Sequence, residues 1–295
     1  MNREPRVAFG PGPLSPARSV RSSQHSRSQH SRSYVGHVPV VQEFATLVAS
    51  GAEPLDRALA LIAATGRPEV DPDALVASLD ELAVEVPADD AATLCRGLFT
   101  GLGFSGNSAD YYDPDNSLLD RVLDRRTGIP ITLAVLAMEV GRRRDVSLVG
   151  IGMPGHFLLR DVRDHDAFYD AFDSGRTLDR DGCRRVFSNL HGPTAQFSDT
   201  FLDPVSPVEI VVRVLNNLRA AHLRRGDRAG FASVLRLQAA LPWAGVSERR
   251  QLAGVLAEQG HFIEAATLYE QLSTDDVGRS DQHRRAVERL RANLN

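Results

Sequence analysis

The most constraining feature of this sequence is an apolar stretch that begins at Pro130. The segment PITLAVLAMEVGRRR is almost wholly apolar for its first eleven residues. A proline is favoured in the first turn of a helix, and the terminal arginines suit a helix C-terminus. A helix that is apolar on every side must be buried. The segment therefore predicts a central helix on which the rest of the domain packs.

Strand-like segments follow this predicted helix. VSLVGIG (146–152) is typical of a strand, and HFLLRDV (156–162) with AFYDAFD (167–173) is typical of a hairpin. A helix, a strand and a hairpin in this order predict an α+β core. If the hairpin arms pair antiparallel, His156 lies opposite Phe172 or Asp173. An aspartate there can accept the imidazole N–H and fix its tautomer, so His156 and Asp173 form a candidate catalytic pair.

Helices are predicted on both sides of this core. Residues 40–103 contain several segments with helix-spaced apolar positions, and the chain becomes wholly helical after Pro207. The turn glycines of two later helical pairs, Gly226 and Gly260, are 34 residues apart, the period of tetratricopeptide repeats. Two interpretations of this tail stay open: a groove that binds a peptide, or a helical lid that stabilises the core.

The first 38 residues differ in composition from the remainder. They contain the repeat QHSRSQHSRS, six arginines and one glutamate, and they cannot bury a core. We expect a disordered leader, with a basic arm for an acidic partner as the alternative. Since the net charge is −4, residues 39–295 carry −9, which argues against nucleic-acid binding.

No apolar run reaches the length of about 18–20 residues that a membrane helix needs, and the N-terminus has no signal-peptide core. We therefore expect a cytoplasmic protein without a membrane segment. Its two cysteines, Cys95 and Cys183, are expected to be reduced thiols rather than a disulfide.

Four motifs of the sequence resemble those of a known protein family. In order, DPDNS, RRTGIPI, PGHFLLR and FDSG resemble the SirB family of bacterial transglutaminase-like proteins, over about residues 40–275. The resemblance implies a papain-like core with a central helix packed on an antiparallel sheet, followed by a tetratricopeptide-like tail. It also places His156 and Asp173 at the histidine and aspartate positions of the superfamily. The expected organisation is a leader (1–38), a transglutaminase-like domain with N-terminal helices (39–205) and a helical region (206–295).

The nucleophile of the superfamily is missing from this resemblance. A glycine-x-cysteine opens the central helix in the wider superfamily, and those positions here are Gly128, Ile129 and Pro130. Proline has no nucleophilic group. Thr132 is the nearest hydroxyl, although packing or capping in the first helical turn explains it better.

Three roles for the remaining pair stay open: a structural hydrogen bond, a polar contact to a ligand, or activation of water by His156. Nothing in the sequence points to a cofactor or metal, because His156, His165 and His191 show no recognised ligand spacing. We therefore expect a non-catalytic protein that binds a protein or peptide through its cleft or C-terminal helices. The alternative is a cysteine-independent hydrolase or acyltransferase that uses His156 and Asp173 on amide or ester bonds. No feature specifies an oligomeric state.

Overall fold

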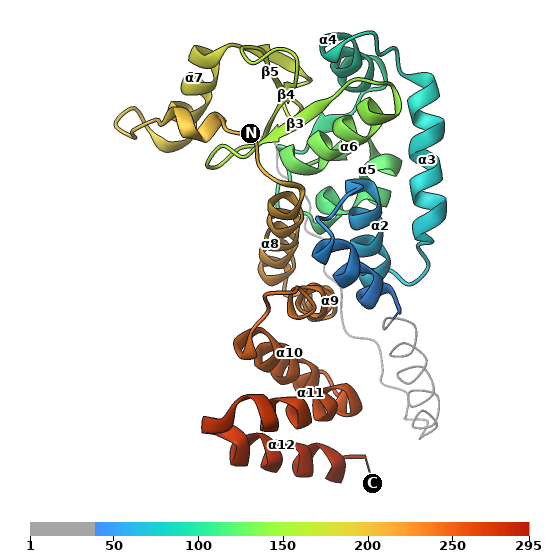
Figure 1. Ribbon diagram of the computed structural model, residues 1–295, viewed down its shortest axis with the longest axis vertical. Coiled ribbons are helices and arrows are strands. Elements are labelled where there is room, and N and C mark those ends of the chain that lie inside the picture. Colours follow the sequence, from blue (N-terminus) through green and yellow to red (C-terminus); the bar gives the residue numbers. More distant parts are fainter. Residues whose placement is uncertain (1–38, 295) are drawn as a thin grey trace, which may run out of the picture.

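The predicted central helix is confirmed as α6 (Pro130–Arg143) in a computed structural model that describes residues 39–294. Pro130 occupies its first turn and Arg142 and Arg143 its last. Its middle is fully buried, with no exposure at Leu133 or Leu136. Figure 1 shows α6 between the sheet and the N-terminal helices. The predicted leader, residues 1–38, lies outside the described residues.

Helices from the N-terminal half cover one side of α6. They are a first helix (39–49), α2 (Leu55–Gly66), α3 (Pro72–Glu85), α4 (Ala91–Cys95) with a π-helical turn (Arg96–Gly101), and α5 (Leu119–Arg125). Asp71 and Asp90 cap α3 and α4 by accepting backbone N–H groups. Such caps satisfy donors that have no partner inside the helix. The sequence prediction of a helical N-terminal section is confirmed.

The other side of α6 packs on a four-stranded antiparallel sheet. Its strands follow chain order: β3 (Leu148–Ile151), β4 (Leu158–Asp161), β5 (Phe168–Asp170) and β6 (Arg176–Leu178). Alternate residues face opposite sides, as strand geometry requires. Leu159 and Tyr169 join the core around α6, whereas Leu158 and Phe168 pack on α7 (Arg180–His191) and the segment after it. The predicted α+β core of helix and antiparallel sheet is confirmed.

A second, two-stranded sheet lies at the start of α6. In it β1 (Ser105–Gly106) pairs in parallel with β2 (Thr127–Gly128), so that Gly106 is opposite Gly128. The loop that follows β1 contains the 3₁₀ turn Pro114–Ser117. The backbone N–H of Ile129 donates to the backbone carbonyl oxygen of Asn116 in this turn, at 3.2 Å. These bonds attach the loop to the residues that open the central helix.

The region after residue 206 is all helical, as predicted. It consists of α8 (Pro207–Arg225), α9 (Arg228–Ala239), α10 (Val246–Glu258), α11 (Phe262–Asp275) and α12 (Ser280–Ala292), stacked below the α+β body in Figure 1. Gly226 and Gly260 both have positive φ, at 65° and 81°, which explains glycine at these turns.

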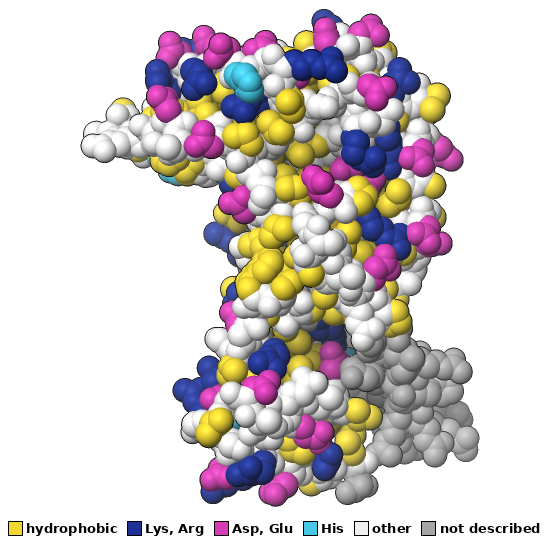
Figure 2. Space-filling view, viewed as in Figure 1, with side chains coloured by type: hydrophobic (Ala, Val, Ile, Leu, Met, Phe, Trp, Pro, Cys, Tyr) yellow, Lys and Arg dark blue, Asp and Glu magenta, His cyan; other side chains and the backbone are white. Residues whose placement is uncertain are grey.

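The hydrophobic core is continuous across the predicted boundary at residues 205 and 206. Val214 and Leu218 of α8 and Leu237 of α9 belong to the same cluster as α6, whereas α10 to α12 form a separate cluster with α9. Figure 2 shows a broad upper body and a narrower tail, with charges of both signs over the visible face. Within residues 39–294, no helix is both long and apolar enough to cross a membrane.

Candidate functional site

His156 lies in the turn between β3 and β4, where the sheet meets α8. Gly155 precedes it with a φ of 76°, and the backbone N–H of His156 donates to Met153 at 3.1 Å. The His156 side chain is about one-tenth exposed. Its ring meets the ring of Phe172 edge to face, with centroids 6.2 Å apart. The imidazole is therefore held at the surface end of the sheet without being enclosed.

The carboxylate that contacts this imidazole is Asp170, which corrects the pairing expected from the sequence. His156 Nε2 lies 2.9 Å from Asp170 Oδ2. The other oxygen, Oδ1, accepts the backbone N–H groups of Phe172 and Asp173 at 3.1 and 3.2 Å. Asp173 itself lies in the turn after β5, and its half-exposed carboxylate pairs with Arg176 at 3.1 Å. Asp170 is the residue that can orient the imidazole.

Strand alternation explains why Asp170 takes this role. The register aligns Leu159 with Tyr169. Continued from this pair, it places His156 on the sheet face that carries Asp170, and Asp173 on the opposite face. The chain also leaves the strand after Asp170. Side chains alternate between the two faces of a sheet, and applying this alternation to both strands would have favoured Asp170 from the sequence. The expectation of Asp173 considered only which residue lies opposite His156 on the neighbouring strand.

Phe172 connects the His156–Asp170 pair to the start of α6. Gly106 lies beneath the Phe172 ring so closely that a Cβ atom at this position would overlap the ring. Because Gly106 is paired with Gly128, the Phe172 side chain stands next to the residues that open α6. The helix opens with Pro130, as predicted.

Thr132 does not bond to the imidazole. Its side chain is fully buried, and its Oγ1 has no hydrogen-bond partner in the described part of the chain. His156 has Asp170 as the one side chain hydrogen-bonded to its ring among residues 39–294. No hydroxyl or thiol is therefore in hydrogen-bond reach of His156 in that part of the protein.

Both thiols lie elsewhere in the core. Cys95 at the end of α4 is 1% exposed and Cys183 in α7 is 0% exposed. Burial raises the pKa of each thiol to about 12. A buried, protonated thiol is a poor nucleophile, since the thiolate is the reactive form. Neither cysteine replaces the nucleophile that Pro130 lacks.

Aromatic and basic side chains surround the imidazole, and most of them were not singled out from the sequence. Tyr111 packs edge to face on Phe172, with centroids 6.0 Å apart. Tyr112 lies under the guanidinium of Arg224, 3.8 Å from its ring centroid. Arg213 of α8 donates through Nη2 to the carbonyl oxygens of Met153 and His156, at 3.3 and 3.4 Å. No local signal in the sequence marked Arg213.

The other two histidines considered in the sequence, His165 and His191, lie outside the His156–Asp170 pair. His191 Nε2 bonds to the carbonyl oxygen of Pro154 at 3.0 Å, and His165 lies in the exposed turn between β4 and β5. Within residues 39–294, no three His, Cys, Asp or Glu side chains are grouped as metal ligands would be.

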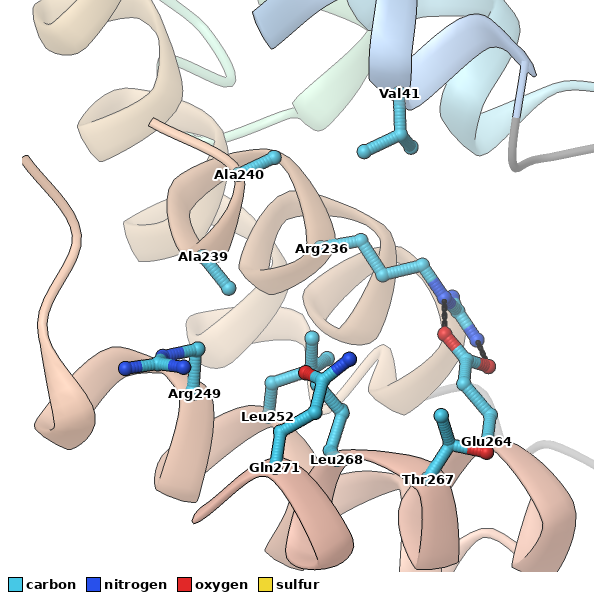
Figure 3. A pocket seen from close by; sticks show the side chains of 10 residues that line it. All are labelled: Val41, Arg236, Ala239, Ala240, Arg249, Leu252, Glu264, Thr267, Leu268 and Gln271. Atoms are coloured by element: carbon cyan, nitrogen blue, oxygen red, sulfur yellow. Dashed lines mark hydrogen bonds and ion pairs between the residues drawn. The ribbon is translucent and has the colours of Figure 1, made fainter. Parts of the chain in front are cut away.

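The helical tail carries a separate groove of about 320 Å³ (Figure 3). One end is closed by a two-bond ion pair between Arg236 and Glu264, at 2.7 and 2.8 Å. The Gln271 side chain has no hydrogen-bond partner among the described residues. The groove is lined by one residue of the first helix and by residues of α9, α10 and α11 with the turn after α9: Val41, Arg236, Ala239, Ala240, Arg249, Leu252, Glu264, Thr267, Leu268 and Gln271.

Known proteins resemble this chain mainly over the α+β body. A family model described as the transglutaminase-like superfamily matches residues 62–216. A UPF0162 protein of Xylella fastidiosa is 44% identical over 144 residues, covering 47% of this chain and 51% of the relative. A UPF0162 protein of Pseudomonas aeruginosa is 37% identical over 174 residues, covering 56% and 64%.

F-box only protein 21 of Homo sapiens is 32% identical over 139 residues, covering 44% of this chain and 21% of that protein. The matches thus span between about half and two-thirds of these bacterial relatives and about a fifth of the human one. No solved structure matches this chain.

Proposed function

Because this chain belongs to the transglutaminase-like superfamily but has no available thiol at its site, we propose that it is a non-catalytic member that binds a peptide segment of a partner protein. The observation that carries this proposal is the start of α6. Pro130 occupies the first turn there, and both cysteines are buried with the pKa of each at about 12. Losing a nucleophile removes most of the rate of a triad enzyme but leaves its binding surfaces.

The groove of the helical tail supports a peptide as the ligand. Its floor of alanine and leucine side chains suits an apolar side chain, and the unpaired Gln271 amide can bond to a peptide backbone. The 34-residue spacing of Gly226 and Gly260 supports a tetratricopeptide-like tail. The motifs DPDNS, RRTGIPI, PGHFLLR and FDSG support placing the chain in the SirB branch of the superfamily.

Hydrolysis is the second candidate, and the His156–Asp170 pair favours it. With Nε2 engaged by Asp170, Nδ1 is the nitrogen left to take a proton from water. In this mechanism Asp170 fixes the tautomer and stabilises the imidazolium, and water attacks the amide or ester directly. The imidazolium then returns the proton to the leaving amine or alcohol as the bond to the carbonyl carbon breaks. This mechanism requires no cysteine.

One experiment separates the two candidates. The purified protein is incubated with a pool of random hexapeptides, and retention and cleavage are both measured by mass spectrometry. Under the binding proposal a subset is retained and nothing is cleaved. Ala239→Phe fills the groove and should release the retained peptides, whereas the matched exposed change Ala292→Phe should not. Cleavage that disappears in a folded His156→Ala variant would establish the hydrolase instead. Retention unchanged by Ala239→Phe would remove the groove from the proposal.

A further inference from the structure

A ring of four side chains beside the sheet leaves several polar groups without protein partners. The ring of His156 contacts Phe172, and Phe172 contacts Tyr111. Arg213 donates a hydrogen bond to the backbone carbonyl oxygen of His156. Arg213 and Tyr111 are close enough to influence each other: burial lowers the pKa of Arg213, and Tyr111 acts in the opposite direction. The four residues come from three loops and α8 and converge on one place.

Arg213 is a cation without a counter-ion. It is half-buried, and it has no carboxylate within ion-pair distance among residues 39–294. Glu209, one turn earlier on α8, instead accepts hydrogen bonds from Ser206 at the helix cap. A Cβ atom at Gly152 would overlap Nη1, so a side chain there would displace the guanidinium. A partly buried charge without a partner is costly, which makes this position one that an anion would stabilise.

Two side chains of this ring have hydrogen-bond donors without a partner among the described residues. In the described chain, Arg213 Nε and Nη1 and the Tyr111 hydroxyl have no hydrogen-bond partner. Neither of these two guanidinium nitrogens is fully enclosed, unlike the unpartnered Oγ1 of Thr132, and Tyr111 is 37% exposed. The loop that carries Tyr111 is fixed to α8 by an ion pair between Asp110 and Arg225. The donors are therefore positioned before any ligand arrives.

We propose that Arg213 and Tyr111 bind the carboxylate of a peptide, so that this place beside the sheet recognises a charged end or side chain of the ligand. The inference rests on the proposed function and assigns its ligand class. With Nη2 engaged by the backbone, Nε–H or Nη1–H can donate a charge-assisted hydrogen bond to a carboxylate oxygen. Arg213 supplies one positive charge that has no carboxylate within ion-pair distance in the described chain. One charge suits a carboxylate better than a phosphate, which carries about −1.5 to −2.

The test compares hexapeptide pools that contain no acidic residue, with either a free or an amidated C-terminus. A third, amidated pool carries one glutamate and distinguishes a side-chain from a terminal carboxylate. We expect about tenfold or greater preference for the carboxylate-bearing pools, since one charge-assisted bond contributes about this much. Arg213→Gln should abolish the preference. Arg219→Gln is the matched control, because both arginines lie on α8 and donate through Nη2. Each guanidinium also lies over a phenylalanine ring, that of Phe157 for Arg213 and that of Phe231 for Arg219.

If Arg213→Gln does not fold, Tyr111→Phe removes one donor from a partly exposed ring and should still reduce the preference. A wild-type protein that binds all pools equally, or a folded Arg213→Gln protein that keeps the preference, would overturn the inference while leaving peptide binding intact. If no peptide binds, the proposed function fails. The anion site is then tested separately, by measuring the thermal stability of the protein with acetate as the only added anion. Thermal stabilisation by acetate that depends on Arg213 supports the site, and its absence overturns it.

Discussion

Replacing Asp170 with alanine removes the acceptor of three hydrogen bonds from a carboxylate that is 3% exposed. The imidazole of His156 and the backbone N–H groups of Phe172 and Asp173 would each lose a partner. A buried donor left unsatisfied costs about 1–3 kcal/mol. Taking the lower value for each, because the imidazole can turn toward water, we expect the free energy of unfolding to fall by about 3 kcal/mol.

Asp173→Ala is the matched control, three residues further along the chain, in the turn after β5. Its carboxylate is 56% exposed and its contact with Arg176 is an exposed ion pair. Such pairs contribute about 0–1 kcal/mol, so the expected loss is below about 1 kcal/mol. Asp170→Asn should fall between the two, since an amide oxygen can still accept the backbone N–H groups.

Urea denaturation followed by circular dichroism measures all three variants, with equal m-values required for the comparison. The imidazole resonances of His156 in each variant show whether its surroundings change. An Asp173→Ala protein that loses as much stability as Asp170→Ala would refute the assignment of the pair. So would an Asp170→Ala protein within about 0.5 kcal/mol of the wild type, the range typical of surface changes.

Three further predictions follow from the core. Thr132→Val should raise the free energy of unfolding by about 1 kcal/mol in urea denaturation, because it removes an unpaired buried hydroxyl; a loss of stability would mean that Oγ1 has a partner. Gly106→Ala should lower the free energy of unfolding by about 1–3 kcal/mol, because the new Cβ atom overlaps the Phe172 ring. In a Phe172→Ala background most of this loss should disappear, and an unchanged loss would mean that the overlap with Phe172 is not its cause. Cys95 and Cys183 should react slowly with a thiol reagent at pH 9 unless the protein is unfolded, because thiols with a pKa of about 12 are about 0.1% ionised there; fast native reaction would contradict their burial.

Much of the site could not be predicted because its contacts join distant residues. Arg213 is 57 residues from His156, and the loop with Tyr111 reaches the sheet through the pairing of Gly106 with Gly128. No local pattern specifies such pairings. The pairing of Asp170 with His156 could be predicted in part, because strand alternation places Asp170 and Asp173 on opposite faces of the sheet. The groove of the tail likewise depends on how three helices and the first helix pack.

The sequence by itself determined the elements: the buried α6 with Pro130 in its first turn, the helices on both sides, the strands after it and the histidine between two of them. These follow from local rules, because apolar spacing and turn residues act within a few positions. Only the tertiary structure decided that Asp170 holds the imidazole, that both thiols are enclosed, and that an unpaired arginine from α8 stands beside the pair. Register, burial and charge balance depend on the whole packed chain, and no short segment contains them.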